Sequence, residues 1–453
     1  MKKDKIGFLI FHIFFIAFVL FLKNVATFQN EALEMKFLEC LLMGVYIYTF
    51  FTAKIYLEWL NSYMIFLYTL FLFNFTRIFL DIVNYREFGW ATKFANFYFF
   101  YDVRNEIINV FLLVLLFTHL GFFIAISNEK INEIRSSVTL ESRRLFTNVG
   151  MALFIISLPA LAYKMFIQLR VILRAGYEAY YTGILKGVDY PAFTKGSGTV
   201  MTIGFLIFLI SIPSKRKFLT ISSLYLMVKL LDSFKGARAI FLTQLLFIMW
   251  YYAKVYGIRI KAKTMVKLVG FTVIFSQILV SVRSKKIFSL DLINSIFNFL
   301  FSQGVSYLVL GYTINFKHSI VGNGSYPYIL QGIFGFKPQS LETLATTNSI
   351  ADKLTYYLNS GAYLKGEGIG SNYIAEMYDL GYFWLIVISI LLGIFIINKL
   401  LFYTKSFLYP KRLILWGRAC KKYGNANCSL CADFQFWLYV QEDRGEEGID
   451  LIF

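Results

Sequence analysis

The feature that most constrains this chain is a series of apolar runs, each long enough to cross a lipid bilayer. Runs of roughly 17–25 apolar residues must form helices or closed barrels there, because no water satisfies their backbone groups. The predicted spans are 6–22, 37–53, 60–80, 107–126, 145–167, 199–212, 218–231, 239–253, 265–282 and 374–397. A further apolar piece, 290–316, is broken by polar residues and glycine, and we expect it to lie along the membrane surface or to dip in without crossing.

Composition agrees with this pattern, since 58% of the 453 residues are hydrophobic and only 16% are charged. The sequence therefore predicts an all-α integral membrane protein, a polytopic bundle of about 10–12 transmembrane helices. Residues 1–416 are expected to form a single membrane domain with a long loop at about 317–370. Residues 417–453 form a polar tail of unusual composition with three cysteines, and a shifted reading frame is one hypothesis for it.

The net charge of +18 is best explained by membrane topology, because lysine and arginine accumulate in cytoplasmic loops. Lys2, Lys3 and Lys5 predict a cytoplasmic N-terminus. Counting spans from there places the 317–370 loop on the outer side. The basic residues are scattered between spans rather than gathered on one face, which argues against nucleic acid as a partner.

Several function classes lack the residues that they require. The chain has no zinc-protease helix motif, no serine-hydrolase elbow and no nucleotide-binding P-loop. The three tail cysteines have no nearby histidine and fall one ligand short of a structural zinc site. We therefore expect neither a metal nor another cofactor.

A short polar corner separates two apolar runs at 232–238 (DSFKGAR), and the topology places this corner on the outer side. Basic groups there run against the charge bias of membrane proteins, so an anionic ligand or anchoring to lipid headgroups must explain them. Guanidinium groups are well suited to holding a diphosphate and stabilising it as a leaving group. The candidate residues for the diphosphate are Lys235, Arg238, Arg170, Arg174 and Arg283.

A glycine-rich stretch leads into the last predicted span and carries Glu376 and Asp379 on one helical face. Acidic residues at a helix start are favoured by the helix dipole, which is the structural explanation. A partly desolvated carboxylate can also act as a general base, which makes Glu376 a catalytic candidate. Tyrosines near the outer loops are typical of membrane interfaces but also suit sugar rings. Asn372, Tyr373 and His318 are the candidates for glycan contacts.

Three stretches, in this order, resemble the Wzy-type O-antigen polysaccharide polymerases of bacterial inner membranes. They are 232–238 (DSFKGAR), followed by an apolar span that ends in Trp250-Tyr251-Tyr252, then 302–306 (SQGVS), and then 370–376 (GSNYIAE), which runs into 378–382 (YDLGY). The resemblance covers roughly residues 229–400, and the N-terminal half agrees in hydropathy alone.

The resemblance implies a C-type glycosyltransferase architecture and a reaction on the periplasmic face. A glycan on undecaprenyl diphosphate would be transferred onto the next lipid-linked repeat unit, with Arg238 neutralising the departing diphosphate and Glu376 accepting the hydroxyl proton. It also implies a separate chain-length regulator as a partner. A lipid-linked oligosaccharide flippase and an O-antigen ligase remain as alternatives. The expected location is the bacterial inner membrane.

Overall fold

The computed structural model describes residues 2–25, 28, 30–91, 96–126, 140–175, 190–233, 238–258, 260–265, 267–268, 270–271, 274, 292–320, 339–346, 349–364, 366 and 368–407. These residues are almost entirely helical, and the strands among them are the short antiparallel pair β1 (Trp90–Ala91) and β2 (Phe97–Tyr98). The prediction of an all-α membrane protein is confirmed.

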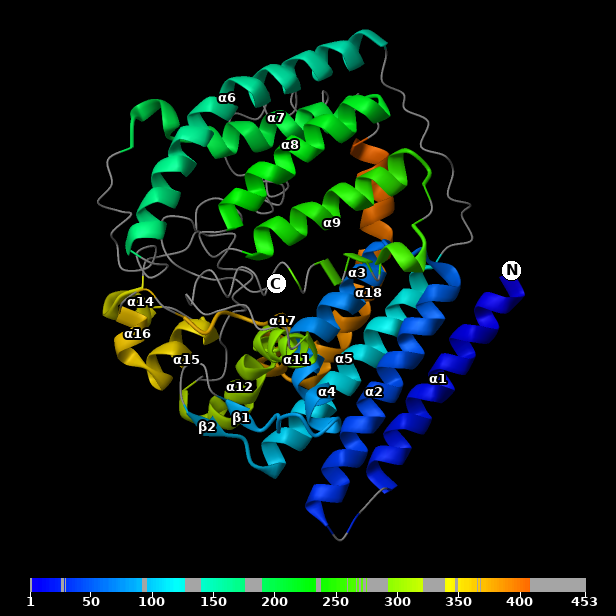
Figure 1. The fold of residues 1–453 in the computed structure, drawn as a ribbon. Coiled ribbons are helices and arrows are strands. Elements are labelled where there is room, and N and C mark those ends of the chain that lie inside the picture. The colour runs from blue at the N-terminus through cyan, green and yellow to red at the C-terminus, as the bar shows by residue number, and fades with distance from the viewer. Residues whose placement is uncertain are drawn as a thin grey trace. The chain divides into compact units, whose positions relative to one another are not determined.

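The described chain falls into two compact units (Figure 1). Unit 1 combines the first 130 residues with residues 291–401, and unit 2 contains residues 131–290. The single membrane domain expected over 1–416 stays a prediction, and the 417–453 tail lies outside the described residues.

The helices of unit 1 come from both ends of the chain (Figure 1). The N-terminal helices are α1 (Lys2–Val25), α2 (Glu31–Tyr56), α3 (Ser62–Leu70), a π-helical turn (Phe71–Phe75), α4 (Thr76–Ile82) and α5 (Tyr101–Ala125). The C-terminal helices are α11 (Leu292–Gln303), α12 (Ser306–Ile320), α14 (Leu341–Thr346), α15 (Ile350–Leu358), α16 (Ser360–Leu364), α17 (Tyr373–Asp379) and α18 (Tyr382–Phe407).

Six helices among the described residues are long and apolar enough to span a membrane. They cover Ile6–Val25, Glu31–Tyr56, Ser62–Ile82, Tyr101–Ala125, Arg143–Val171 and Ala192–Ile210, and a shorter apolar helix covers Tyr382–Ile397. Each matches a span predicted from hydropathy. The predicted span 265–282 lies largely outside the described residues.

Helix α5 is the most deeply buried element of unit 1. Most of its residues from Ile107 to Ala125 are buried, and α1, α2 and α12 pack against it. Gly121 allows α18 to approach closely, since an added Cβ would lie 2.9 Å from the carbonyl carbon of Ile390. Gly393 has the same role on α18, because its Cβ would lie 2.9 Å from the backbone nitrogen of Phe122. Small residues at such crossings are typical of helices packed in membranes.

Unit 2 contains α6 (Leu140–Ala175), a 3₁₀ turn (Ala192–Thr194), α7 (Ser197–Ile210), α8 (Lys215–Ser233) and α9 (Arg238–Val255). Helices α6 and α7 meet at a glycine pair, because a Cβ on Gly150 would lie 2.5 Å from the nitrogen of Phe208 and a Cβ on Gly204 2.8 Å from that of Phe154. The Tyr251 hydroxyl donates to the Leu209 carbonyl and fastens α9 to α7.

Two apolar stretches near the C-terminus differ from the expectation. The predicted span 374–397 is divided into α17 and α18 at Gly381, whose φ of +104° is a conformation that favours glycine. The interrupted piece 290–316 forms two helices, α11 and α12, which part at Gly304 and Val305. Both breaks fall within the stretches that resemble the family.

Candidate functional site

The stretches 302–306 and 370–376 come together in unit 1, at the π-helical turn between α3 and α4. The side-chain nitrogen of Asn372 donates to the Asn74 side-chain oxygen at 2.9 Å and to the Ser306 carbonyl at 3.0 Å. Asn74 belongs to the π-helical turn, and Ser306 begins α12. One buried amide therefore joins three segments that lie far apart in the sequence.

Asn372 also caps α17. Its side-chain oxygen accepts a hydrogen bond from the Ile374 backbone at 3.0 Å, which satisfies one of the free donors at the helix start. Only 7% of Asn372 is exposed. The Asn372 amide thus positions α17 within the protein. The glycan contact expected for Asn372 stays a prediction.

Gly304 allows α4 to lie directly against the link between α11 and α12. A Cβ at this position would overlap the Thr76 hydroxyl and lie 2.9 Å from Cγ of Arg77. The glycine of the 302–306 stretch is therefore explained by close packing rather than by backbone conformation.

The other end of α17 is held by Lys317, near the end of α12. Its ammonium group donates to the carbonyls of Asp379 at 3.0 Å and Tyr378 at 3.4 Å, where a cation also complements the helix dipole. Burial raises the pKa of Asp379, while Lys317 and Lys353 act to lower it. Helix α12 thus fixes α17 at both ends.

Glu376 is buried within this arrangement and is only 2% exposed. The hydroxyl of Ser371, from the same stretch, donates to its carboxylate. A buried carboxylate that accepts a hydrogen bond from a neighbouring side chain is held in one orientation, as a general base needs to be. The next candidate, Tyr373, has a buried hydroxyl without a hydrogen-bond partner, and burial raises the pKa of this phenol.

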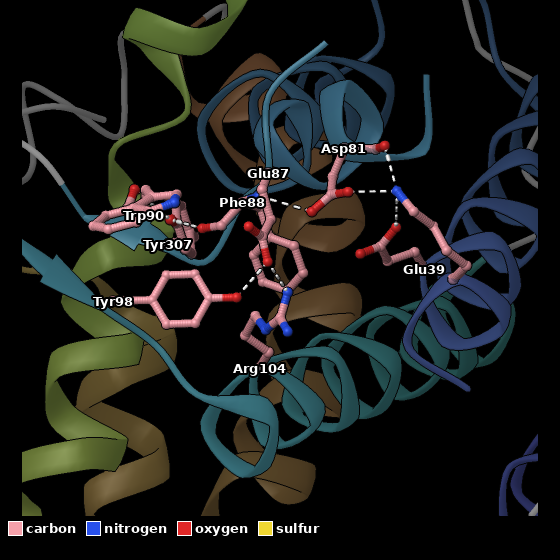
Figure 2. Close-up of polar contacts among 9 residues, drawn as sticks. Glu39, Asp81, Glu87, Phe88, Trp90, Tyr98, Arg104 and Tyr307 are labelled. Carbon is pink, nitrogen blue, oxygen red and sulfur yellow. Dashed lines mark hydrogen bonds and ion pairs between the residues drawn. The ribbon is translucent and has the colours of Figure 1, made fainter. Parts of the chain in front are cut away.

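A network of charged side chains that sequence reasoning missed lies where α4 ends and α5 begins (Figure 2). Lys36 of α2 forms an ion pair with Asp81 of α4 and lies 3.5 Å from the carboxylate of Glu39. The second oxygen of Asp81 accepts from the Phe88 backbone at 2.8 Å. Glu39 is fully buried, and neither of its oxygens has a hydrogen-bond partner. The sequence signal for this network was the presence of charged residues within or next to apolar runs.

The same network fastens the loop between α4 and α5 (Figure 2). Arg104 pairs with Glu87 at 2.8 Å, and the Tyr98 hydroxyl donates to the same carboxylate oxygen. The hydroxyl of Tyr307, on α12, donates to the Phe88 carbonyl. The loop, the β1–β2 pair and α12 are thereby joined into one structure beside α17.

The basic residues predicted to bind a diphosphate belong to unit 2. Arg170 is exposed on α6, Arg174 lies in the last turn of α6, and Arg238 is the first residue of α9. Lys235 and Arg283 lie outside the described residues, as do the side chains of Arg174 and Arg238. His318 lies in α12, and its side chain is likewise outside the described part. No group of three or more metal-ligating side chains occurs among the residues that the structure describes.

Comparison with known proteins identifies the family. A family model described as O-antigen polysaccharide polymerase Wzy matches residues 8–415, which is most of the chain and includes every helix of both units from α2 to α18. No curated protein and no solved structure matches the chain significantly. The matched range contains all three stretches, and two of them meet around α17. The chain therefore belongs to the O-antigen polysaccharide polymerase Wzy family, whose activity is the polymerisation of O-antigen repeat units.

Proposed function

We propose that the chain transfers a glycan from a lipid diphosphate carrier, undecaprenyl diphosphate, onto the next lipid-linked repeat unit. The observation that carries this proposal is the buried carboxylate of Glu376, held by Ser371 at the place where two family stretches meet. A polymerase of this kind needs a base for the acceptor hydroxyl and a positive environment for the departing diphosphate.

The membrane setting supports a lipid-linked donor. A substrate whose carrier stays in the bilayer is accessible to a protein that spans the same bilayer, and six described helices are long and apolar enough to do so. The lysines at the N-terminus favour a cytoplasmic start, which puts the end of α4 and the start of α5 on the periplasmic side. We place the protein in the bacterial inner membrane on this basis, with a chain-length regulator as a further partner.

In the proposed reaction a sugar hydroxyl of the acceptor attacks the anomeric carbon of the donor glycan. The new bond joins the hydroxyl oxygen to this carbon, and the bond from the carbon to the diphosphate oxygen breaks. The proton of the hydroxyl passes to the carboxylate of Glu376, and the diphosphate leaves with the electron pair. The local hydroxyl of Ser371 orients the carboxylate.

The basic groups of unit 2 are the proposed diphosphate contacts. Arg238 stands at the start of α9, where the helix dipole adds to its positive charge. Lys235, Arg170, Arg174 and Arg283 complete the set that the sequence suggests. Asn372, Tyr373 and His318 remain the candidates on the glycan side. Neither transport nor ligation is favoured by a specific observation.

The test is the surface-glycan profile of a strain that lacks this protein, resolved as a ladder. The proposal predicts products that carry a single repeat unit, because export and attachment continue without polymerisation. Complete loss of the glycan would instead indicate a flippase or a ligase. Complementation with Arg238→Ala at matched protein level should fail to restore the ladder, whereas a full ladder would remove Arg238 from the site.

A further inference from the structure

Two arginines of unit 1 lie against the ring of one phenylalanine. The guanidinium carbon of Arg77 is 3.9 Å from the centroid of the Phe301 ring, and that of Arg86 is 4.5 Å from the same centroid. Phe301 is in α11, one residue before the 302–306 stretch. Both guanidinium groups thus lie against the Phe301 ring, next to the 302–306 stretch that resembles the family.

Contacts inside the protein fix the position of the Arg77 side chain. It is only 2% exposed, and its Nε donates to the Phe301 carbonyl at 3.0 Å while a terminal nitrogen donates to the Trp90 carbonyl at 3.4 Å. The centroid of the Tyr307 ring lies 5.5 Å from the guanidinium carbon. This arginine has therefore a single orientation and contributes a permanent positive charge.

Arg86 is placed beside it by the way α4 ends. Asn84 adopts a positive φ of 55°, and the chain turns back so that the Tyr85 backbone donates to the Leu80 carbonyl at 2.9 Å. The Tyr85 hydroxyl then donates to the side chain of Asn298 at 3.1 Å, which holds the turn on α11. Arg86 follows directly and is exposed.

The nearby acids are committed to other cations. Asp81 pairs with Lys36, and Glu87 pairs with Arg104. Across the described part of the chain, neither Arg77 nor Arg86 has a carboxylate within ion-pair distance. Two like charges on one ring repel each other, and their repulsion in a partly desolvated place is relieved by an anion bound between them and solvent.

We propose that Arg86, with Arg77 behind it, binds a phosphoryl group of the lipid diphosphate on one of the two glycan substrates. This inference rests on the proposed function and assigns a phosphate contact to residues of unit 1. A guanidinium binds phosphate through two parallel hydrogen bonds, which a lysine cannot reproduce. A diphosphate carries more charge than the single phosphodiester of a common lipid headgroup, and two arginines match it better.

The site is also connected to the proposed base. Arg77 lies against Gly304, and the same link between α11 and α12 supplies the Ser306 carbonyl that receives Asn372 at the start of α17. A phosphate at Arg86, which lies over the Phe301 ring, would thus be bound next to the link that positions the helix of Glu376.

The test is direct binding to the purified full-length chain, with inorganic pyrophosphate as the probe at constant ionic strength. Arg86→Gln removes the charge at an exposed position, so folding should be preserved. Arg86→Lys keeps the charge without the planar guanidinium. The matched control is Lys54→Gln, which also removes a cation that lies over an aromatic ring, that of Trp59, near the C-terminal end of α2.

We expect Arg86→Gln to weaken pyrophosphate binding at least tenfold, about 1.4 kcal/mol. The affinity of Arg86→Lys should lie between those of wild type and Arg86→Gln, and Lys54→Gln should bind pyrophosphate as tightly as wild type. Equal binding by wild type and Arg86→Gln would overturn the proposal. A second arm adds nanodiscs that contain either phosphatidylglycerol or undecaprenyl diphosphate. Competition by the diphosphate lipid alone supports the substrate as ligand, whereas equal competition by phosphatidylglycerol overturns it.

The same measurements separate this inference from the proposed function. Pyrophosphate binding that depends on Arg86 in a chain that does not polymerise would contradict the proposed reaction and leave the anion site standing. A full polymer ladder in cells that carry Arg86→Gln, together with unchanged binding, would remove the anion site and leave the polymerase.

Discussion

Replacing Asn372 by aspartate should destabilise the protein strongly, although the two side chains have the same shape. The aspartate keeps the oxygen that caps α17 through the Ile374 backbone, and at an exposed helix start the extra charge is neutral or favourable. Here the nitrogen that it replaces donates to Asn74 and to Ser306. The new carboxylate oxygen would face two acceptors in a place that is 7% exposed.

The magnitude follows from these two contacts. Each lost hydrogen bond costs about 1 kcal/mol, and each buried acceptor left without a donor costs about 1–3 kcal/mol. Asn74 can rotate its amide and donate to the carboxylate, which recovers one bond, whereas the other buried carboxylate oxygen faces the Ser306 carbonyl without a donor. We therefore expect Asn372→Asp to lower the free energy of unfolding by about 2–4 kcal/mol.

The measurement is reversible unfolding in mixed detergent micelles, followed by intrinsic fluorescence. The matched control is Asn30→Asp, since Asn30 caps α2 in the same way through the Ala32 backbone at 2.9 Å but is exposed. The control should change stability by no more than about 0.5 kcal/mol. If both variants are as stable as wild type, Asn372 does not join the three segments and the account of α17 is wrong.

Three further predictions concern the same unit. Glu376→Gln should reduce polymer formation by roughly 10²–10⁴-fold at unchanged protein level. The control Asp379→Asn, on the same helix, should retain most activity. Equal effects of the two substitutions would argue against Glu376 as the base. Gly304→Ala should cost about 1–3 kcal/mol of stability in the micelle assay, because the added methyl group overlaps α4, and an unchanged variant would refute the close packing. Burial raises the pKa of Asp352, so its contribution to stability is full below the unfolded pKa near 4 and declines as the pH rises through the folded pKa. Asp352→Asn should therefore gain stability relative to wild type as the pH rises above about 4, and a difference that does not change with pH would contradict the assignment.

Hydropathy predicted all six membrane-length helices of the described residues, because a backbone in lipid must satisfy its own hydrogen bonds. The predicted spans 218–231 and 239–253 form α8 and α9, which are not among these six. The run 107–126 became the buried part of α5, and 37–53 became the middle of α2. The division of 374–397 was missed, since its apolar pattern continues through Gly381 and only the backbone conformation reveals the turn. Glu376 was consequently expected at the mouth of a span, whereas it lies in a separate short helix.

The polar connections could not be predicted because their partners are far apart in the sequence. Arg77 and Phe301 are separated by 224 positions, and Asn372 and Asn74 by 298. A glutamate or an arginine within an apolar run signals a functional or structural site, but its partner depends on how the helices pack. The stretches 302–306 and 370–376 could be recognised from the sequence, and the structure adds that they meet.

Polymerisation by this chain alone can be tested by reconstituting the purified full-length protein in vesicles. The vesicles contain the undecaprenyl-diphosphate-linked repeat unit and no other protein. We expect lipid-linked products that grow by whole repeat units over time and that are missing with Glu376→Gln. Vesicles in which the repeat unit stays single with wild-type protein, while the lipid moves between leaflets, would contradict the polymerase and indicate a transporter.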